Sequence, residues 1–272
     1  MTAISTGGFT VTDGNMSAYG TLIRLAIIPV MIAGSVSFNV HDQLISQRKL
    51  SALWKNRQHF FFLLLLGLGS IAIALETYSD IRQLAWIDSS FQWVSALTTC
   101  GFNSRPLQFW SSHQKILLTL AMIMGGAAGS TVGGLKLNRV LVLIEAVSWQ
   151  LRRRTLSARQ MTLRTVDGQR LEQAQASRQV EDVTALALMW LVSIALGVFI
   201  LIPIVPNEYG LVDILFETTS ALGAAGLSVG ITGPSLHWAG KSTIVFLMWM
   251  GRLEIIPVLM VLYLPVLWIK QR

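Results

Sequence analysis

The chain has 272 residues, of which 53% are hydrophobic and only 13% are charged. So few charged residues cannot coat a water-soluble globule of this size, and the composition therefore indicates a protein embedded in lipid. The net charge of +7 does not predict a nucleic-acid partner, because the basic residues lie in blocks beside apolar runs, as membrane topology requires. The one cysteine, Cys100, excludes an internal disulfide and a multi-cysteine metal site.

The apolar runs, taken in chain order, predict an all-helical protein. A helix needs about twenty residues to cross a bilayer, and four runs are long enough: residues 22–40, 60–77, 183–205 and 244–269. A fifth run, 116–149, contains the glycine-rich stretch 125–134, and because glycine weakens helices we expect a broken helix there. The segments 87–97 and 212–222 are too short to span, and each ends in Thr-, Gly- and Ala-rich sequence. We predict that both are re-entrant.

The distribution of basic residues predicts the orientation, since loops rich in Lys and Arg face the cytoplasm. One such loop holds Arg48, Lys49, Lys55 and Arg57, and the other holds Arg152, Arg153, Arg154, Arg159, Arg164, Arg170 and Arg178. This assignment gives five crossings and an outward N-terminus, although no signal peptide precedes it. Because the first residues repeat the end of a re-entrant segment, we expect the sequence to begin partway through a longer protein.

An internal repeat relates three segments that align without gaps, namely residues 2–10, 95–103 and 220–228. Gly8, Gly101 and Gly226 fall in one column of this alignment. An aromatic residue or leucine follows each glycine, and a residue with a hydroxyl or amide side chain comes next. A spanning helix follows each copy. The repeat unit is therefore a helix, a short re-entrant helix, a glycine loop and a second helix.

Such a unit suits the passage of a cation. A cation that enters a membrane must exchange its water shell for fixed oxygens, and non-helical backbone is tolerated at that depth where it lines a water-filled path. Glycine lets carbonyl oxygens converge without side chains between them, and the Thr and Ser residues of two copies add hydroxyl oxygens. Cys100 occupies the position of the repeat where Gly7 and Ala225 stand, so we interpret it as a small residue that fits a crowded site and not as a nucleophile.

These motifs resemble the Trk/Ktr/HKT superfamily of K+ transporters, and specifically its bacterial Trk/Ktr branch. The motifs are Ser5-Thr-Gly-Gly-Phe9, Thr98-Thr-Cys-Gly-Phe102, Gly223-Ala-Ala-Gly-Leu227, the glycine-rich stretch from Met124 to Lys136, and Gly251-Arg-Leu-Glu254. The resemblance implies an all-α membrane protein with helix–pore-loop–helix units of the fourfold ion-channel type. It implies passage of K+, or of Na+, through a selectivity filter, with the transported ion bound at the filter and no cofactor.

The resemblance also assigns roles to residues. The ion-binding filter would comprise Ser5, Thr6, Gly7, Gly8, Thr98, Thr99, Cys100, Gly101, Gly223, Ala224, Ala225 and Gly226. A flexible gate would comprise Gly125, Gly126, Gly129, Gly133 and Gly134, to which we add Lys136, Arg252 and Glu254. For Gly129 and Gly133, close helix packing through small residues is the alternative.

Family members carry four units around one pore, and this sequence departs from that pattern. Residues 1–58 correspond to the end of the second unit, 59–180 to the third and 181–272 to the fourth. The missing N-terminal pore units would leave a filter that cannot close alone. The resemblance further implies a multi-pass subunit of the cell (inner) membrane, a homodimer, and a cytosolic nucleotide-binding regulatory subunit. The Arg152–Arg154 run could meet that subunit or could simply anchor the topology.

Two alternative functions stay open at this point. One is a non-conducting, truncated assembly subunit. The other is an intramembrane serine hydrolase that uses Ser228, which lies in a Gly-x-Ser-x-Gly sequence. We expect no enzyme, because that motif requires a preceding strand and a re-entrant helix precedes this serine.

Two ionisable residues, Arg252 and Glu254, lie inside the last apolar run, where an unpaired charge is costly. Residues two apart on a helix do not face each other, so their partners must come from other helices. We expect Lys136 or Arg139 to pair with Glu254, and Arg252 to project into the pore. The alternative, in which both side chains reach the inner interface, is disfavoured because about 22 Å of helix would follow before Lys270.

Overall fold

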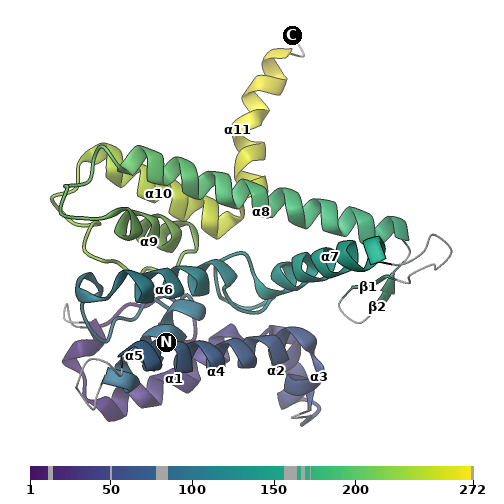
Figure 1. The fold of residues 1–272 in the computed structure, drawn as a ribbon, viewed down its shortest axis with the longest axis horizontal. Coiled ribbons are helices and arrows are strands. Elements are labelled where there is room, and N and C mark those ends of the chain that lie inside the picture. The colour runs from purple at the N-terminus through teal and green to yellow at the C-terminus, as the bar shows by residue number, and fades with distance from the viewer. Residues whose placement is uncertain are drawn as a thin grey trace.

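The computed structural model describes residues 1–11, 15–49, 51–77, 85–155, 164–166, 169–171 and 173–270. Its elements are helical except for one antiparallel hairpin, formed by β1 (Arg164–Val166) and β2 (Gln169–Leu171). The all-helical prediction is therefore confirmed but for this hairpin, which lies at the far end of α7 and α8 in Figure 1. Of the basic residues in that loop, Arg159 lies outside the described residues.

The elements follow the order that the repeat predicts. The first part holds η1 (Asn15–Ala18), α1 (Thr21–Ser35), α2 (Phe38–Ile45) and α3 (Ala52–Lys55). The middle part holds α4 (Arg57–Thr77), α5 (Ala85–Leu97), η2 (Leu107–Phe109), α6 (Ser112–Met124) and α7 (Leu137–Thr155). The last part holds α8 (Gln173–Leu201), α9 (Leu211–Leu222), α10 (Trp238–Leu253) and α11 (Ile255–Lys270).

Two of these helices, α4 and α8, are long and apolar enough to cross a membrane unbroken, among the residues that the structure describes. Helix α4 contains the run predicted at 60–77, and α8 overlaps the run predicted at 183–205 but begins ten residues earlier and ends at Leu201. The chain is thus a membrane protein, and exposed apolar side chains such as Leu191 and Phe199 on α8 are suited to contact lipid. The run at 116–149 is broken between α6 and α7, as predicted.

The other two predicted spans are not straight helices. The run at 22–40 bends by 107° between α1 and α2, and the run at 244–269 bends by 111° between α10 and α11. Glu254 sits at the second bend with a φ of +66°, a conformation that ends the helix. In the described part, two unbroken helices and the two bent pairs, if each pair is one span, give up to four crossings, and the fifth predicted crossing is the broken run at 116–149.

The short helices α5 and α9 lie at the centre of the packing. Helix α5 contacts α4, α6 and α1, whereas α9 contacts α8, α6 and α10. Their large apolar side chains are fully buried, as Phe91 on α5 and Phe216 on α9 show. Figure 1 shows α9 between α10 and α6, with α11 projecting away from the rest of the fold. The two short helices can therefore hold their C-terminal ends in fixed positions.

Close packing of α4 on α5 generates a test of this arrangement. A Cβ atom at Gly69 would collide with the ring of Trp93, which is buried and donates from Nε1 to the carbonyl of Leu65 at 3.0 Å. The ring cannot move without losing this bond. We expect Gly69→Ala to lower the melting temperature of the detergent-solubilised protein by at least about 2 °C, since overpacking costs about 1–3 kcal/mol.

The matched control is Gly67→Ala in the same helix, where a Cβ atom would meet nothing within 4 Å. Because alanine is the better helix former, this variant should melt no lower than the parent. Equal melting temperatures for the two variants, measured by intrinsic tryptophan fluorescence, would contradict the packing of α5 on α4.

Candidate ion-conduction site

Three glycine loops, residues 5–8, 98–101 and 223–226, have the same backbone geometry. In each, the residue before the last glycine donates its N–H to the carbonyl five residues earlier, at 2.8 Å for Gly7 and 2.9 Å for both Cys100 and Ala225. The residue two positions before the last glycine has a positive φ in every loop; these residues are Thr6, Thr99 and Ala224. The repeat found in the sequence is thus a repeat of structure as well.

The last glycine of each loop has a left-handed backbone, with φ of +65° at Gly8, +85° at Gly101 and +78° at Gly226. Glycine adopts this conformation without steric cost. A Cβ atom at Gly8 would collide with the carbonyl oxygen of Cys100, and one at Gly101 would collide with that of Ala225. The three loops therefore lie side by side, with backbone carbonyl oxygens against the glycines.

The loop side chains are mostly engaged within the protein. The Thr98 hydroxyl donates to the carbonyl of Val94 at 2.8 Å, and the fully buried Cys100 thiol lies 3.6 Å from the carbonyl of Ala3. Ser5 is exposed, and its hydroxyl donates to the carbonyl of Thr2 at 3.4 Å. Backbone carbonyl oxygens are accordingly the main groups that these loops can offer to a cation.

Two polar residues that the sequence analysis missed anchor the loops from behind. Gln92 and Glu217 are buried, and each stands nine residues before the last glycine of its loop. Gln92 Oε1 accepts from the N–H of Ser104 at 3.3 Å, and Glu217 Oε2 accepts from the N–H of Val229 at 3.1 Å. Both N–H groups belong to the residue three positions after the loop glycine. Gln92 and Glu217 therefore occupy equivalent positions of the repeat and make equivalent hydrogen bonds.

The interruption at residues 125–136, called the break below, contacts all three loops. The Thr6 hydroxyl donates to the carbonyl of Thr131 at 2.9 Å. The N–H of Gly133 donates to the Thr99 hydroxyl at 2.9 Å, and that of Gly134 donates to the carbonyl of Gly223 at 3.1 Å. The break therefore lies directly against the residues that precede the loop glycines.

Several glycines of the break adopt conformations or contacts that other residues tolerate poorly. Gly125, Gly129 and Gly134 have φ of +65°, +74° and +75°. A Cβ atom at Gly133 would collide with the carbonyl of Gly223, and one at Gly126 would lie 2.8 Å from the side chain of Val132. The sequence of the break is thus fitted to non-helical backbone packed under the loops.

The charges near the end of α10 find partners on α7 and on the break. Arg139 Nη2 lies 2.8 Å from Glu254 Oε2, and Lys136 Nζ lies 3.5 Å from Glu254 Oε1, as predicted. Arg252 is exposed, and its Nη1 reaches the carbonyl of Thr131 at 3.5 Å. The helix expected before Lys270 is present as α11, but it does not continue α10, because α10 ends at Leu253 and α11 turns away by 111°. Their contacts, and not a following length of helix, fix their position.

Ser228 does not form a nucleophilic site. Its hydroxyl donates to Glu217 Oε1 at 2.8 Å and accepts from the N–H of Gly230 at 3.0 Å. His237 uses Nδ1 to accept from the N–H of Ala239 at the start of α10. In the described part of the chain no histidine contacts this serine, so the hydroxyl serves the loop anchor.

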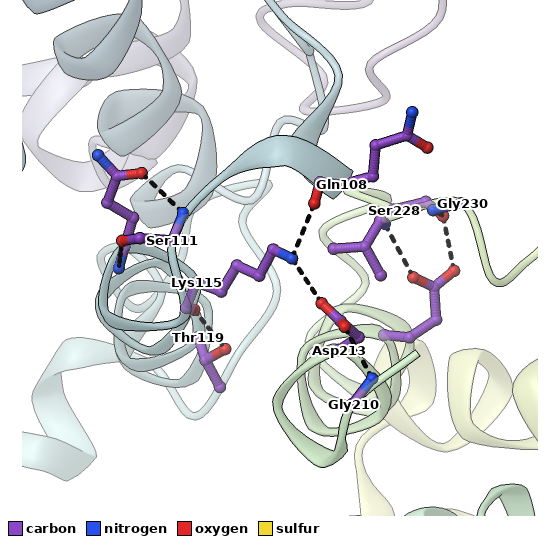
Figure 2. A network of polar contacts seen from close by, with 11 residues as sticks. Gln108, Ser111, Lys115, Thr119, Gly210, Asp213, Ser228 and Gly230 are labelled. Carbon is purple, nitrogen blue, oxygen red and sulfur yellow. Dashed lines mark hydrogen bonds and ion pairs between the residues drawn. The ribbon is translucent and has the colours of Figure 1, made fainter. Parts of the chain in front are cut away.

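Ion pairs join α1 and α6, two of the helices that follow a glycine loop, to the next short helix. Asp88, in the first turn of α5, pairs with Arg24 of α1 and with Arg105 Nε at 2.6 Å. Lys115 of α6 is buried, and its Nζ lies 2.7 Å from Asp213 Oδ1 in the first turn of α9. Figure 2 shows the Lys115 side chain extended between Asp213 and Gln108 of η2.

The fold and these loops define a membrane protein of repeated pore-loop units. The model of one family, described as "TrkH: Cation transport protein", matches residues 1–266, and the chain belongs to this family. It is a family of transporters and not of enzymes, which removes the serine-hydrolase alternative.

Individual relatives agree with this placement. An uncharacterized cation transporter of Methanocaldococcus jannaschii is 29% identical over 95% of this chain and 51% of its own length. The Trk system potassium uptake protein TrkH of Salmonella typhimurium is 27% identical over 97% of this chain and 55% of its own length. The crystal structure of the potassium transporter TrkH from Vibrio parahaemolyticus matches with a TM-score of 0.84 and 24% identity, over 96% of this chain and 56% of that one. The chain spans about half the length of these relatives.

The loop anchor generates a prediction. In Glu217→Gln one acceptor oxygen becomes an NH2 donor that faces the donors of Ser228, Val229 or Thr232. An unpaired buried donor costs about 1–3 kcal/mol, so we expect faster hydrogen–deuterium exchange at residues 229–232. Glu208→Gln, at an exposed position before α9, is the control and should leave exchange unchanged. Unchanged exchange in both variants would contradict the anchoring role.

Proposed function

We propose that this chain forms three walls of a four-walled pore that conducts K+ down its electrochemical gradient, as part of the membrane subunit of a K+ uptake system. The observation that carries the proposal is the backbone contact between three glycine loops of one geometry. Carbonyl oxygens held in this way can replace the water shell of a cation. The ion-binding residues are the twelve filter positions predicted from the sequence, with the carbonyl oxygens next to Gly8, Gly101 and Gly226 as the main ligands.

The choice of K+ rests on relatives such as TrkH of Salmonella typhimurium, which is named a potassium uptake protein. Na+ is the competing cargo, since carbonyl oxygens also bind Na+. We also propose the partners that the sequence resemblance implies: the missing pore units, a second copy that completes a homodimer, and a cytosolic nucleotide-binding subunit. The basic residues 152–154, at the end of α7, are the proposed meeting point for that subunit.

The break serves as the gate in this proposal. It bonds to all three glycine loops, and Arg252 holds the carbonyl of Thr131 within it. Glu254 ties α10 to Arg139 of α7 and to Lys136 at the end of the break, so the middle and the C-terminal end of the break are linked to the fourth unit. A positive charge at Arg252 beside the ion path would slow cations by repulsion, and movement of the break would open the path.

A second candidate, a chain that does not conduct alone, is favoured by the open side of Gly226. A Cβ atom there would meet only the Cα of Gly101, at 3.9 Å, whereas the two other loop glycines lie against a neighbouring carbonyl. Liposomes that contain the purified chain alone should take up no radioactive rubidium. Liposomes with the chain joined to the missing units should take it up, with K+ as the better competitor than Na+. No uptake by the joined protein would contradict the proposed function.

The filter assignment predicts a change of selectivity. In the joined protein, serine at Gly101 cannot avoid the carbonyl of Ala225, and its left-handed φ is unfavourable for a residue with a side chain. We expect Gly101→Ser to reduce the preference for K+ over Na+ in the rubidium competition assay. Gly233→Ser is the control, because a Cβ atom there meets nothing within 4 Å. Equal preference in the two variants would contradict the assignment.

The gate assignment predicts a gain of flux. Thr99→Val removes the acceptor of the Gly133 N–H, and losing a hydrogen bond of about 1 kcal/mol would shift the gate equilibrium about five-fold toward the open state. Thr243→Val, whose hydroxyl bonds only within α10, is the control. A Thr99→Val protein that folds normally and conducts no faster than this control would contradict a gate at the break.

A further inference from the structure

The two ion pairs between units occupy the same place in the repeat. Asp88 and Asp213 each stand thirteen residues before the last glycine of their loop, Gly101 and Gly226. Each pairs with a basic residue of the helix that follows the preceding loop: Arg24 of α1 for Asp88, and Lys115 of α6 for Asp213. Thus α1 and α6 each supply a basic side chain to the short helix of the next unit.

Lys241 of α10 is the corresponding basic residue of the last unit. Arg24, Lys115 and Lys241 stand sixteen, fourteen and fifteen residues after Gly8, Gly101 and Gly226. Lys115 donates to the carbonyl of Gln108 at 3.1 Å, and Lys241 donates to that of Pro234 at 2.7 Å. Both carbonyls belong to the residue seven positions earlier, so the two lysines share one local geometry.

The two lysines differ in what lies beyond this shared bond. Lys115 is buried and meets Asp213, whereas Lys241 is exposed and no carboxylate pairs with it among the residues that the structure describes. The loop glycine of the same unit, Gly226, also lacks a contact that its equivalents make, because Gly8 and Gly101 each lie against a neighbouring carbonyl and Gly226 does not. Two independent features therefore leave the same side of the last unit open.

We infer that Lys241 is the docking residue for the pore unit that completes the ring, and that this unit carries an Asp or Glu in the first turn of its short helix, thirteen residues before its loop glycine. The inference rests on the proposed function, which requires a fourth wall. A second copy of this chain is a poor occupant, because its own Asp88 and Asp213 are already paired. Burial of Lys241 upon docking would leave it dependent on this acidic partner.

A charge exchange tests the inference. The probe is the part of TrkH from Vibrio parahaemolyticus that lies outside the match, with the residue thirteen positions before its loop glycine set to Asp or to Lys. Each probe is co-expressed with the tagged chain, and capture is measured after affinity purification in detergent. The unaltered chain should capture the Asp probe about ten-fold better than the Lys probe, as expected for a desolvated charge pair. Lys241→Glu should reverse this preference, and Lys241→Gln should reduce it.

Lys55→Glu, at an exposed lysine that ends α3, is the control and should keep the preference for the Asp probe. A misfolded Lys241→Glu variant would capture neither probe, so its capture of the Lys probe shows that the variant is folded. If the unaltered chain and the Lys241→Glu variant show the same preference between the Asp and Lys probes, the inference is overturned. Capture of a second copy of this chain that depends on Lys241 would also overturn it. Rubidium uptake by the same complexes separates the two claims. Charge-dependent assembly without uptake would support docking at Lys241 and contradict the proposed function. Uptake without charge-dependent assembly would support the proposed function and contradict docking at Lys241.

Discussion

Every backbone N–H and C=O group inside a membrane needs a partner, and the glycine loops of this chain are built around that requirement. A helix satisfies its own groups, but the loops and the break leave the helix at the depth of the short helices. The loops recover their bonds in three ways: by the bond to the carbonyl five residues earlier, by the anchors Gln92 and Glu217, and by the bonds between break and loops. In the proposed pore, the carbonyl oxygens that these bonds do not use would bind the ion.

The rest of the architecture follows from holding three such loops together. Because the loops touch through backbone atoms at Gly8 and Gly101, small shifts of the short helices would separate them. The ion pairs at Asp88 and Asp213 fix the other ends of these helices to the preceding unit, so each short helix is held at both ends. Asp88 and Lys115 are nearly inaccessible, and breaking such buried pairs is costly. The register of the units is therefore set by charge as well as by packing.

Much of this was predictable because it depends on residues at fixed spacing. The segments predicted at 87–97 and 212–222 coincide with α5 and α9, and the glycine-rich stretch coincides with the break. The bends after α1 and α10 were not predicted, because hydropathy averages over the single residue at which a helix ends. At Glu254 the signal was present, since a carboxylate inside an apolar run requires partners that a straight helix would not reach. Gln92 and Glu217 were missed because the alignment was read only from residues 95 and 220 onward; extending it backward places both in one column.

The central claim is that the carbonyl oxygens beside Gly8, Gly101 and Gly226 bind the transported cation. The most direct measurement is anomalous diffraction from crystals of the chain joined to its missing units and grown in rubidium. The account predicts anomalous peaks on the axis between the glycine loops, at the level of the Cys100 and Ala225 carbonyls, that disappear when sodium replaces rubidium. A well-ordered set of loops without rubidium between them, or rubidium bound only elsewhere, would contradict it.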